Sequence, residues 1–435
     1  MATADEEFLK AFHQALADKP LEPDDPWYVP IYAKATADPV QRMAQKISWS
    51  LESTQLFGGF RGTGKSTELR RLRQDLERDG SCKVVLCDMK HYLNLSTPID
   101  ISDFLISAAG ALSDALAQDP ELLGEDLAQR GYWQRAMDFL RRTQIEASEL
   151  SASPANLKLG LHEDPSFREK LQAQMKGHLG ALVNDVREFM ADCVKAIRRK
   201  HGADVQLVVL FDSIEQIRGT SVNEDAVFAS VETLFAGHPD KLRFESMHVI
   251  YTAPPWLKIQ FPGVVNHYDG AYLLPCVKVR HHRGGTDEEG VQVLRDIVKK
   301  RGDWTRLFAR ADDFDHVLLA TGGYLRDLFR GLMGMLMNAA QHGLPLTREA
   351  VDLEIAELRN HYLPIAGDDA AWLWQIATSH DAELPEYAKL PRLARYFDTH
   401  LLLCYRNGEE WYDLHPLIRD AVEKRLKISG RPTDG

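Results

Sequence analysis

One short stretch of the chain carries the residue types needed to hold the phosphates of a nucleotide. Residues 59–66 read GFRGTGKS, which fits the pattern GxxxxGK[ST] at every fixed position. Glycines let backbone N–H groups curl round a β-phosphate, and Lys65 brings an ammonium to the β- and γ-phosphates. The Ser66 hydroxyl can ligate Mg²⁺. We therefore expect ATP or ADP with Mg²⁺ to bind through Gly59, Gly62, Thr63, Gly64, Lys65, Ser66 and Thr67.

A pair of carboxylates follows the apolar run Gln206–Asp212. The run resembles a Walker B segment, a buried strand that delivers an aspartate to a magnesium-bound water. We expect Asp212 to hold Mg²⁺ in this way and Glu215 to orient the attacking water. Together with Lys65, these two residues form the predicted catalytic set. The alternative is an aspartate that caps a strand and a solvated glutamate.

Two further side chains are candidates for contacts with the nucleotide. Thr252 ends the apolar run His248–Ala253, where a polar residue can sense the γ-phosphate. Arg326 begins a helical pattern after the flexible pair Gly322 and Gly323, and a lid arginine can reach phosphates from there. The alternatives are a strand-ending threonine and an ordinary surface arginine.

A parallel sheet is needed to bring these residues to one edge, and the pattern of apolar runs predicts it. Helical patterns over Lys65–Arg78 and Ile101–Leu116 separate the runs, the second with a cap in Thr97–Asp100 and Pro98 at its first position. The fold class is therefore α/β, a three-layer αβα core with helices on both faces of a parallel sheet. The expected strands are Gln55–Gly59, Lys83–Met89, Gln206–Asp212, His248–Ala253 and Ala271–Val279.

The rest of the chain predicts three further parts. Four prolines between Pro20 and Pro30 favour a mostly irregular arm, with a helix that begins near Asp38 and Pro39. The turn Asn407-Gly408 between apolar runs predicts a hairpin, and helices around it suggest a winged helix. The expected parts are an arm (1–45), the core (46–285, with a charged helical insertion at about 119–200), a helical lid (286–360) and a winged-helix domain (361–435).

Composition limits the partners. With 52 basic and 64 acidic residues the net charge is −12, so any contact with nucleic acid needs a local basic patch. Residues 361–435 hold nine Lys/Arg against twelve Asp/Glu, which argues against strong phosphate-backbone binding. No signal peptide or membrane-length apolar run is present, and the five cysteines have no CxxC spacing. We expect a cytoplasmic protein with unpaired thiols and no membrane contact.

Five strings together resemble the AAA+/STAND branch of P-loop ATPases. This branch includes the archaeal origin-recognition-type ATPases and the NACHT and NB-ARC switch proteins of immunity, and the resemblance covers roughly 46–427. The string GFRGTGKSTELRRL also looks like stand-alone bacterial ATPases of mobile-element and defence gene clusters. The five strings are GGFRGTGKST, LVVLFDSIE, VIYTAPP, TGGYLRDL and WYDLHPLIRD.

The resemblance implies roles for two residues. WYDLHPLIRD looks like the signature of STAND winged helices, whose histidine contacts the β-phosphate of ADP and locks the closed state; that histidine is His415 here. TGGYLRDL looks like the lid arginine motif of origin-type ATPases, which implies this role for Arg326. The chain departs from large STAND proteins because it lacks a repeat sensor and an obvious effector domain.

These features favour an ATP-driven switch with slow, regulatory hydrolysis. ATP would open or oligomerise it, ADP would close it, and a separate effector protein would carry the output, as in anti-phage defence. The alternative is a DNA-associated ATPase that uses the winged helix on duplex DNA. A small-molecule kinase fits poorly, because the lid and the winged helix have no role in it. Candidates for an arginine finger are Arg218, Arg280 and Arg301.

Overall fold

The chain divides into two compact units. The computed structural model describes residues 4–32, 38–122, 131–143, 153–220, 222–382, 386 and 389–428. The sheet unit comprises Pro39–Gly59 and Arg71–Leu273. The lid unit comprises Met1–Asp38, Phe60–Arg70 and Leu274–Gly435, so it includes most of the predicted phosphate loop.

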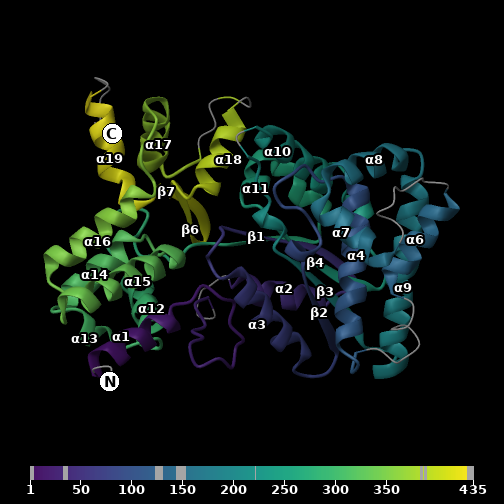
Figure 1. Ribbon diagram of the computed structural model, residues 1–435, viewed down its shortest axis with the longest axis horizontal. Helices are drawn as coiled ribbons and strands as arrows, with labels where there is room; N and C mark the ends of the chain where they lie inside the picture. The colour runs from purple at the N-terminus through teal and green to yellow at the C-terminus, as the bar shows by residue number, and fades with distance from the viewer. Residues whose placement is uncertain are drawn as a thin grey trace. The chain divides into compact units, whose positions relative to one another are not determined.

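A five-stranded sheet forms the centre of the sheet unit, with the strand order β2-β3-β4-β1-β5 (Figure 1). The pairs β2–β3, β3–β4 and β4–β1 are parallel, which confirms the predicted α/β fold class. The last strand ends at Leu274 and not at the predicted Val279, because Pro275 has no N–H to continue the ladder. The strands are β1 (Ser53–Gly59), β2 (Cys82–Asp88), β3 (Gln206–Asp212), β4 (Met247–Ala253) and β5 (Gly270–Leu274).

Helices cover this sheet. The helix α2 (Pro39–Ser48) packs beside β1, and α4 (Ile101–Gln118) packs against β2. The start of α2 confirms the predicted helix after Asp38. The cap of α4 differs from the prediction, because the side chain of Asp100 accepts a hydrogen bond from the Ser102 N–H. A local carboxylate acceptor thus begins the helix, and Pro98 lies before it.

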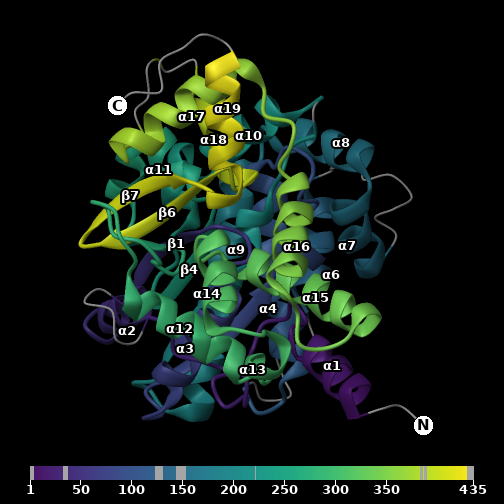
Figure 2. The same ribbon diagram turned by 90° about the vertical axis from the view of Figure 1, so that its left-hand side faces the viewer.

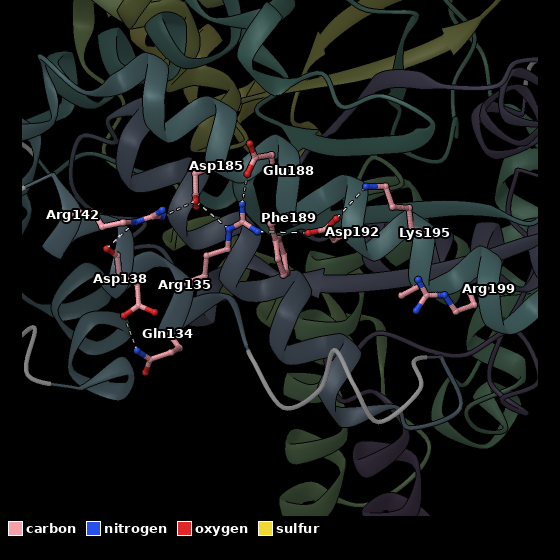
Figure 3. A pocket seen from close by; sticks show the side chains of 11 residues that line it. Gln134, Arg135, Asp138, Arg142, Asp185, Glu188, Phe189, Asp192, Lys195 and Arg199 are labelled. Atoms are coloured by element: carbon pink, nitrogen blue, oxygen red, sulfur yellow. Dashed lines mark hydrogen bonds and ion pairs between the residues drawn. The ribbon is translucent and has the colours of Figure 1, made fainter.

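The charged insertion is a group of helices that packs around α4. A cavity of 760 Å³ is lined by α6 and α9, and Figure 3 shows Arg135 of α6 among three carboxylates of α9. Arg135 lies 3.1 Å from Asp185, 2.9 Å from Glu188 and 3.6 Å from Asp192. Because these charges pair with one another, the cavity is a poor host for phosphate. The helices are α6 (Tyr132–Arg142), α7 (Pro154–Glu163), α8 (Pro165–Met175) and α9 (Leu179–His201).

The lid unit begins with a helix that the sequence did not predict. In α1 (Ala4–Ala15), Leu9, Phe12 and Ala15 form a buried stripe, and the helix packs on α15 (Leu325–His342). This corrects the prediction of a mostly irregular arm, since helical spacing outweighs the prolines that follow. The other lid helices are α12 (Glu288–Lys299), α13 (Trp304–Leu307), α14 (Ala311–Ala320) and α16 (Arg348–Asn360).

Gly322 and Gly323 separate α14 from α15, as predicted. Their φ angles are 61° and 74°, in the region that favours glycine. A Cβ on Gly323 would lie 1.8 Å from the carbonyl oxygen of Val277, so backbone packs directly on backbone here. This close approach fixes the start of α15, where Arg326 lies.

The C-terminal module, residues 367–428, contains the predicted hairpin (Figure 2). Its strands pair in an antiparallel register and Gly408 at the turn has a φ of 103°. One helix packs on each strand, α17 on β7 and α18 on β6, and α19 packs on α17. The elements are α17 (Gly367–Ser379), α18 (Leu390–Asp398), β6 (Leu402–Asn407), β7 (Glu409–Leu414) and α19 (Arg419–Ile428).

Two general properties complete the description. All five cysteines are buried thiols. Within the described part of the chain, every helix is too short or too polar to cross a bilayer.

Candidate functional site

The predicted phosphate loop connects a strand to a helix. β1 ends at Gly59, and α3 (Lys65–Glu77) begins at the lysine of the motif. Gly62 and Gly64 have φ angles of 88° and 97°, which a residue with a Cβ adopts only under strain. The first turn of α3 presents N–H groups that have no acceptor within the helix. This strand–loop–helix arrangement is suited to an anion such as phosphate.

Two polar side chains of the motif bind the loop's own backbone. Lys65 is 4% exposed, and its Nζ donates to the Phe60 carbonyl at 2.7 Å. The Thr63 hydroxyl donates to the same carbonyl at 2.8 Å. An ammonium has three N–H donors, so a bond to one carbonyl is compatible with phosphate binding. Both side chains are therefore held inside the loop. The Lys65 ammonium thus lies where the motif requires a positive charge.

The N-terminal segment lies on the same loop and helix. The Leu21 N–H donates to the Thr67 hydroxyl oxygen at 3.1 Å. One residue later, Glu22 forms an ion pair with Arg70 at 3.0 Å. Thr67, which we expected to contact nucleotide, thus receives a backbone hydrogen bond from the segment after α1.

Arg326 also lies at the loop. A Cβ built on Gly62 would be 2.9 Å from both Cβ and Nε of Arg326, so the arginine covers this glycine. Its Nε and one terminal nitrogen each lie 2.9 Å from a carboxylate oxygen of Asp18. The structure therefore brings the predicted lid arginine to the phosphate loop, where it faces a carboxylate of the N-terminal segment.

His415 is fully buried at another position of the lid unit. Its Nε2 lies 3.3 Å from Asp327 Oδ2, without the alignment of a hydrogen bond, and its Nδ1 accepts a hydrogen bond from the Leu417 N–H at 3.3 Å. The Tyr362 hydroxyl donates to the same carboxylate at 2.5 Å. Burial raises the pKa of Asp327, but His415, Tyr362 and Arg330 together hold this pKa below its ordinary value. His415 thus faces a carboxylate here, and its contact with a nucleotide phosphate stays a prediction.

The sheet unit positions the predicted acidic residues. Asp212 ends β3, and β4 lies between β3 and the strand β1 that leads into the loop. Asp212 is 4% exposed, and its Oδ1 accepts a hydrogen bond from the Ser213 N–H at 2.8 Å. Ser213 has a φ of 72° and turns the chain toward Glu215, which is 8% exposed. Both carboxylates thus follow the carboxyl end of a central strand, the edge where β1 delivers Gly59.

The hydroxyl of Thr252 supports the turn after β3. It accepts a hydrogen bond from the Ile214 N–H at 2.9 Å and donates to the Phe211 carbonyl at 3.3 Å. Thr252 is fully buried in β4, opposite Phe57 of β1. The structure gives this hydroxyl a role in holding the turn that carries Glu215; the γ-phosphate sensor role stays a prediction.

Sequence reasoning missed two side chains that contact the loop. The Tyr324 hydroxyl donates to the Arg61 carbonyl at 2.7 Å, and His400 Nε2 lies 3.2 Å from the same oxygen. Tyr324 lies inside the string TGGYLRDL, but its ring gave no separate signal. His400 lies before the hairpin and belongs to none of the quoted strings.

No family model and no curated protein matches this chain. Among solved structures, it is similar to the ORC2 protein of Aeropyrum pernix, described as ADPNP and ADP complexes, at 11% identity and a TM-score of 0.44, with 96% of this chain and 98% of that chain covered. The Walker-type ATPase paby2304 of Pyrococcus abyssi matches at 12% identity and a TM-score of 0.39, covering 94% and 99%. Cdc6p from Pyrobaculum aerophilum matches at 15% identity and a TM-score of 0.34, with 94% of this chain and 99% of that chain covered.

Proposed function

We propose that this chain binds ATP and ADP with Mg²⁺, hydrolyses ATP slowly, and acts as a nucleotide-state switch of the AAA+/STAND type. The phosphate loop carries the proposal. Its glycines have the required backbone conformation, its lysine is buried inside the loop, and a helix begins directly after it. A glycine-rich surface turn would share the glycine conformation, but it would need neither the buried lysine nor the helix.

The oxygen donors of the chain fit magnesium. Mg²⁺ keeps several waters and takes one or two protein oxygens together with phosphate oxygens. Ser66 supplies a hydroxyl at the start of α3, and Asp212 supplies a buried carboxylate at the end of β3. Bound Mg²⁺ would neutralise charge that develops on the phosphates.

Each remaining residue of the predicted set has one task. Lys65 stabilises negative charge on the β- and γ-phosphates, since a fixed cation lowers the energy of the transition state most in a dry loop. Glu215 accepts a hydrogen bond from the attacking water and orients it. The turn that carries Glu215 is short and buried, which suits a positioned base.

The contacts of the loop within the lid unit support a switch rather than a simple hydrolase. The N-terminal segment reaches the loop through Leu21, the lid through Tyr324 and Arg326, and the C-terminal module through His400. A nucleotide shifts a conformational equilibrium only as far as it binds the two states differently. Because these contacts hold the loop, a change in the packing of the lid unit can change the affinity of the loop for ATP and for ADP. Self-association, a separate effector protein, a cytoplasmic location and anti-phage defence belong to the same proposal.

DNA binding through the C-terminal module is the less favoured alternative. The segment that would contact DNA offers only three cations, Lys389, Arg392 and Arg395, which argues against strong phosphate binding. Arg392 and Arg395 both face Asp369 inside the module. Pairing with this carboxylate reduces the charge available to a DNA backbone.

Calorimetric titration with Mg-ATP and Mg-ADP tests the proposal. Lys65→Ala should weaken binding by at least about 100-fold, because a charge-assisted contact to two phosphates is lost from a buried loop. Its melting temperature should stay near that of the wild type, since Lys65 packs in the loop and not in a core cluster. Lys83→Ala, in the half-buried lysine of β2, is the control and should bind normally. No binding by the wild type, or full hydrolysis by Lys65→Ala, would refute the proposal.

A further inference from the structure

Two side chains of the lid unit hold one carbonyl of the phosphate loop. The Tyr324 hydroxyl lies 2.7 Å from the Arg61 oxygen, and His400 Nε2 lies 3.2 Å from it. Tyr324 and His400 also contact each other, at 3.0 Å between Oη and Nε2. The two side chains are 2% and 8% exposed, so water competes little for these bonds.

The positions of the hydrogens follow from the donors present. A carbonyl only accepts, so the single hydrogen of the Tyr324 hydroxyl points to Arg61. His400 Nε2 must therefore carry a hydrogen of its own, shared between the Tyr324 oxygen and the Arg61 carbonyl. The Arg61 oxygen thus accepts from two donors, one from α15's N-terminal cap and one from the C-terminal module.

The preceding residue of the loop is held by the same module. The ring of Phe60 stacks on Phe397 of α18, with centroids 5.6 Å apart and planes 28° apart. It also lies 6.0 Å from the ring of His400. Phe60 is 1% exposed. Apolar and polar contacts from residues 397–400 therefore hold two successive residues of the loop.

Holding the Arg61 carbonyl also orients the next N–H. In a trans peptide the C=O of one residue and the N–H of the next point in opposite directions. A carbonyl directed at Tyr324 and His400 therefore directs the Gly62 N–H away from them. The Gly62 N–H is one of the donors that the motif offers to phosphate.

We propose that Tyr324 and His400 are positioning residues that orient the Gly62 N–H and so couple docking of the C-terminal module to nucleotide affinity. The inference rests on the proposed function. It assigns to His400 the connection between the C-terminal module and the nucleotide that the sequence suggested for His415. Linkage requires reciprocity: if the docked module raises nucleotide affinity, bound nucleotide stabilises the docked module by the same factor.

Two substitutions and their combination test the effect on nucleotide affinity. His400 has a φ of 59°, a conformation that asparagine tolerates, so His400→Asn shortens the side chain without straining the backbone. His400→Asn and Tyr324→Phe should each weaken Mg-ATP and Mg-ADP binding about threefold to tenfold, the worth of one hydrogen bond. The double variant should lose less than the product of the single effects, because both side chains bind the same carbonyl.

The matched control is His380→Asn, in the same module and with the same φ of 59°. His380 Nδ1 lies 3.2 Å from the Tyr412 carbonyl, and the residue packs on His282 and Trp411 away from the loop. This variant should lower the melting temperature and leave nucleotide affinity unchanged. An equal loss of affinity in His380→Asn would show that general loosening of the module explains the effect, and would overturn the proposal.

Hydrogen exchange of the hairpin strand Leu402–Asn407 tests the reciprocal side. Mg-ADP should slow exchange of this strand in the wild type and in His380→Asn, and have no effect on it in His400→Asn at saturating nucleotide. One outcome would refute the coupling but keep the proposed function. In it, His400→Asn and Tyr324→Phe show the nucleotide affinity and hydrogen exchange of the wild type, while Lys65→Ala loses nucleotide binding. Absence of nucleotide binding in the wild type would refute both.

Discussion

The phosphate loop and the turn after β3 both follow the carboxyl end of a strand, but different parts of the chain hold them. The turn is held by near neighbours: Ser213 binds the side chain of Asp212, and Ile214 binds Thr252 of the adjacent strand. The loop is held by residues far along the chain. Tyr324 is 263 residues from Arg61, and His400 is 339 residues from it.

This difference separates two kinds of control. Bonds to the strands of the sheet hold the turn, so the turn should be equally rigid in every state that keeps the sheet intact. The stiffness of the loop depends on how the lid unit packs, so it can change with the state of that unit. Turnover should therefore respond to changes at the turn, and affinity should respond to changes around the loop.

The largest expected effect is at Glu215. Glu215→Gln should slow single-turnover ATP hydrolysis about 10²- to 10⁴-fold, because the amide still fits but accepts a proton poorly. ATP affinity should stay within about twofold, since the loop is unchanged. Glu224→Gln, at the half-buried start of α10 (Glu224–Glu232), is the control and should hydrolyse ATP normally. Unchanged turnover in Glu215→Gln would assign water activation to another residue.

An intermediate effect is expected at Thr252. Thr252→Val removes the acceptor of the Ile214 N–H and leaves that group buried, which costs about 1–3 kcal/mol of unfolding free energy. Turnover should fall about tenfold as the turn loosens, while nucleotide affinity stays the same. Denaturant unfolding and single-turnover assays measure both. Thr252→Ser keeps the hydroxyl and should behave like the wild type. A loss of nucleotide affinity in Thr252→Val would contradict the statement that changes at the turn affect turnover alone.

The smallest effect is expected at Asp18. Asp18→Asn should raise ATP affinity about twofold to fivefold, because Arg326 no longer pairs with a carboxylate that competes with phosphate. The gain should shrink at high salt, since Asp18 is largely exposed and the ion pair is screened. Glu22→Gln, which releases Arg70 instead, is the matched control. The same gain in Glu22→Gln, or lower affinity in Asp18→Asn, would contradict a specific competition for Arg326.

Patterns within short segments made much of the fold predictable. The four buried strands β1 to β4 read as apolar runs, and the glycine pair marked the break between α14 and α15. The strand–loop–helix arrangement at residues 59–66 was predictable because a phosphate-binding motif needs consecutive residues of fixed type. The helix α1 was missed although acidic residues mark its first turn, because the four prolines that follow it favoured an irregular arm.

Contacts between distant segments could not be predicted in this way. The approach of His400 to Arg61 depends on the packing of the whole lid unit, and no local spacing encodes it. The pairing of Arg326 with Asp18 has the same origin. For Thr252, the sequence placed the residue correctly at the strand end, but not the hydrogen bond that holds the neighbouring turn.

The 339-residue separation between Arg61 and His400 also has a consequence for synthesis of the protein. A ribosome that adds about 5–20 residues per second needs roughly 20–70 s to pass from one to the other. During that interval the nascent chain has the complete motif but lacks the module that orients it. Unfinished or truncated chains would therefore bind nucleotide more weakly than finished ones, so ATP at a limiting concentration would preferentially stabilise chains whose translation is complete.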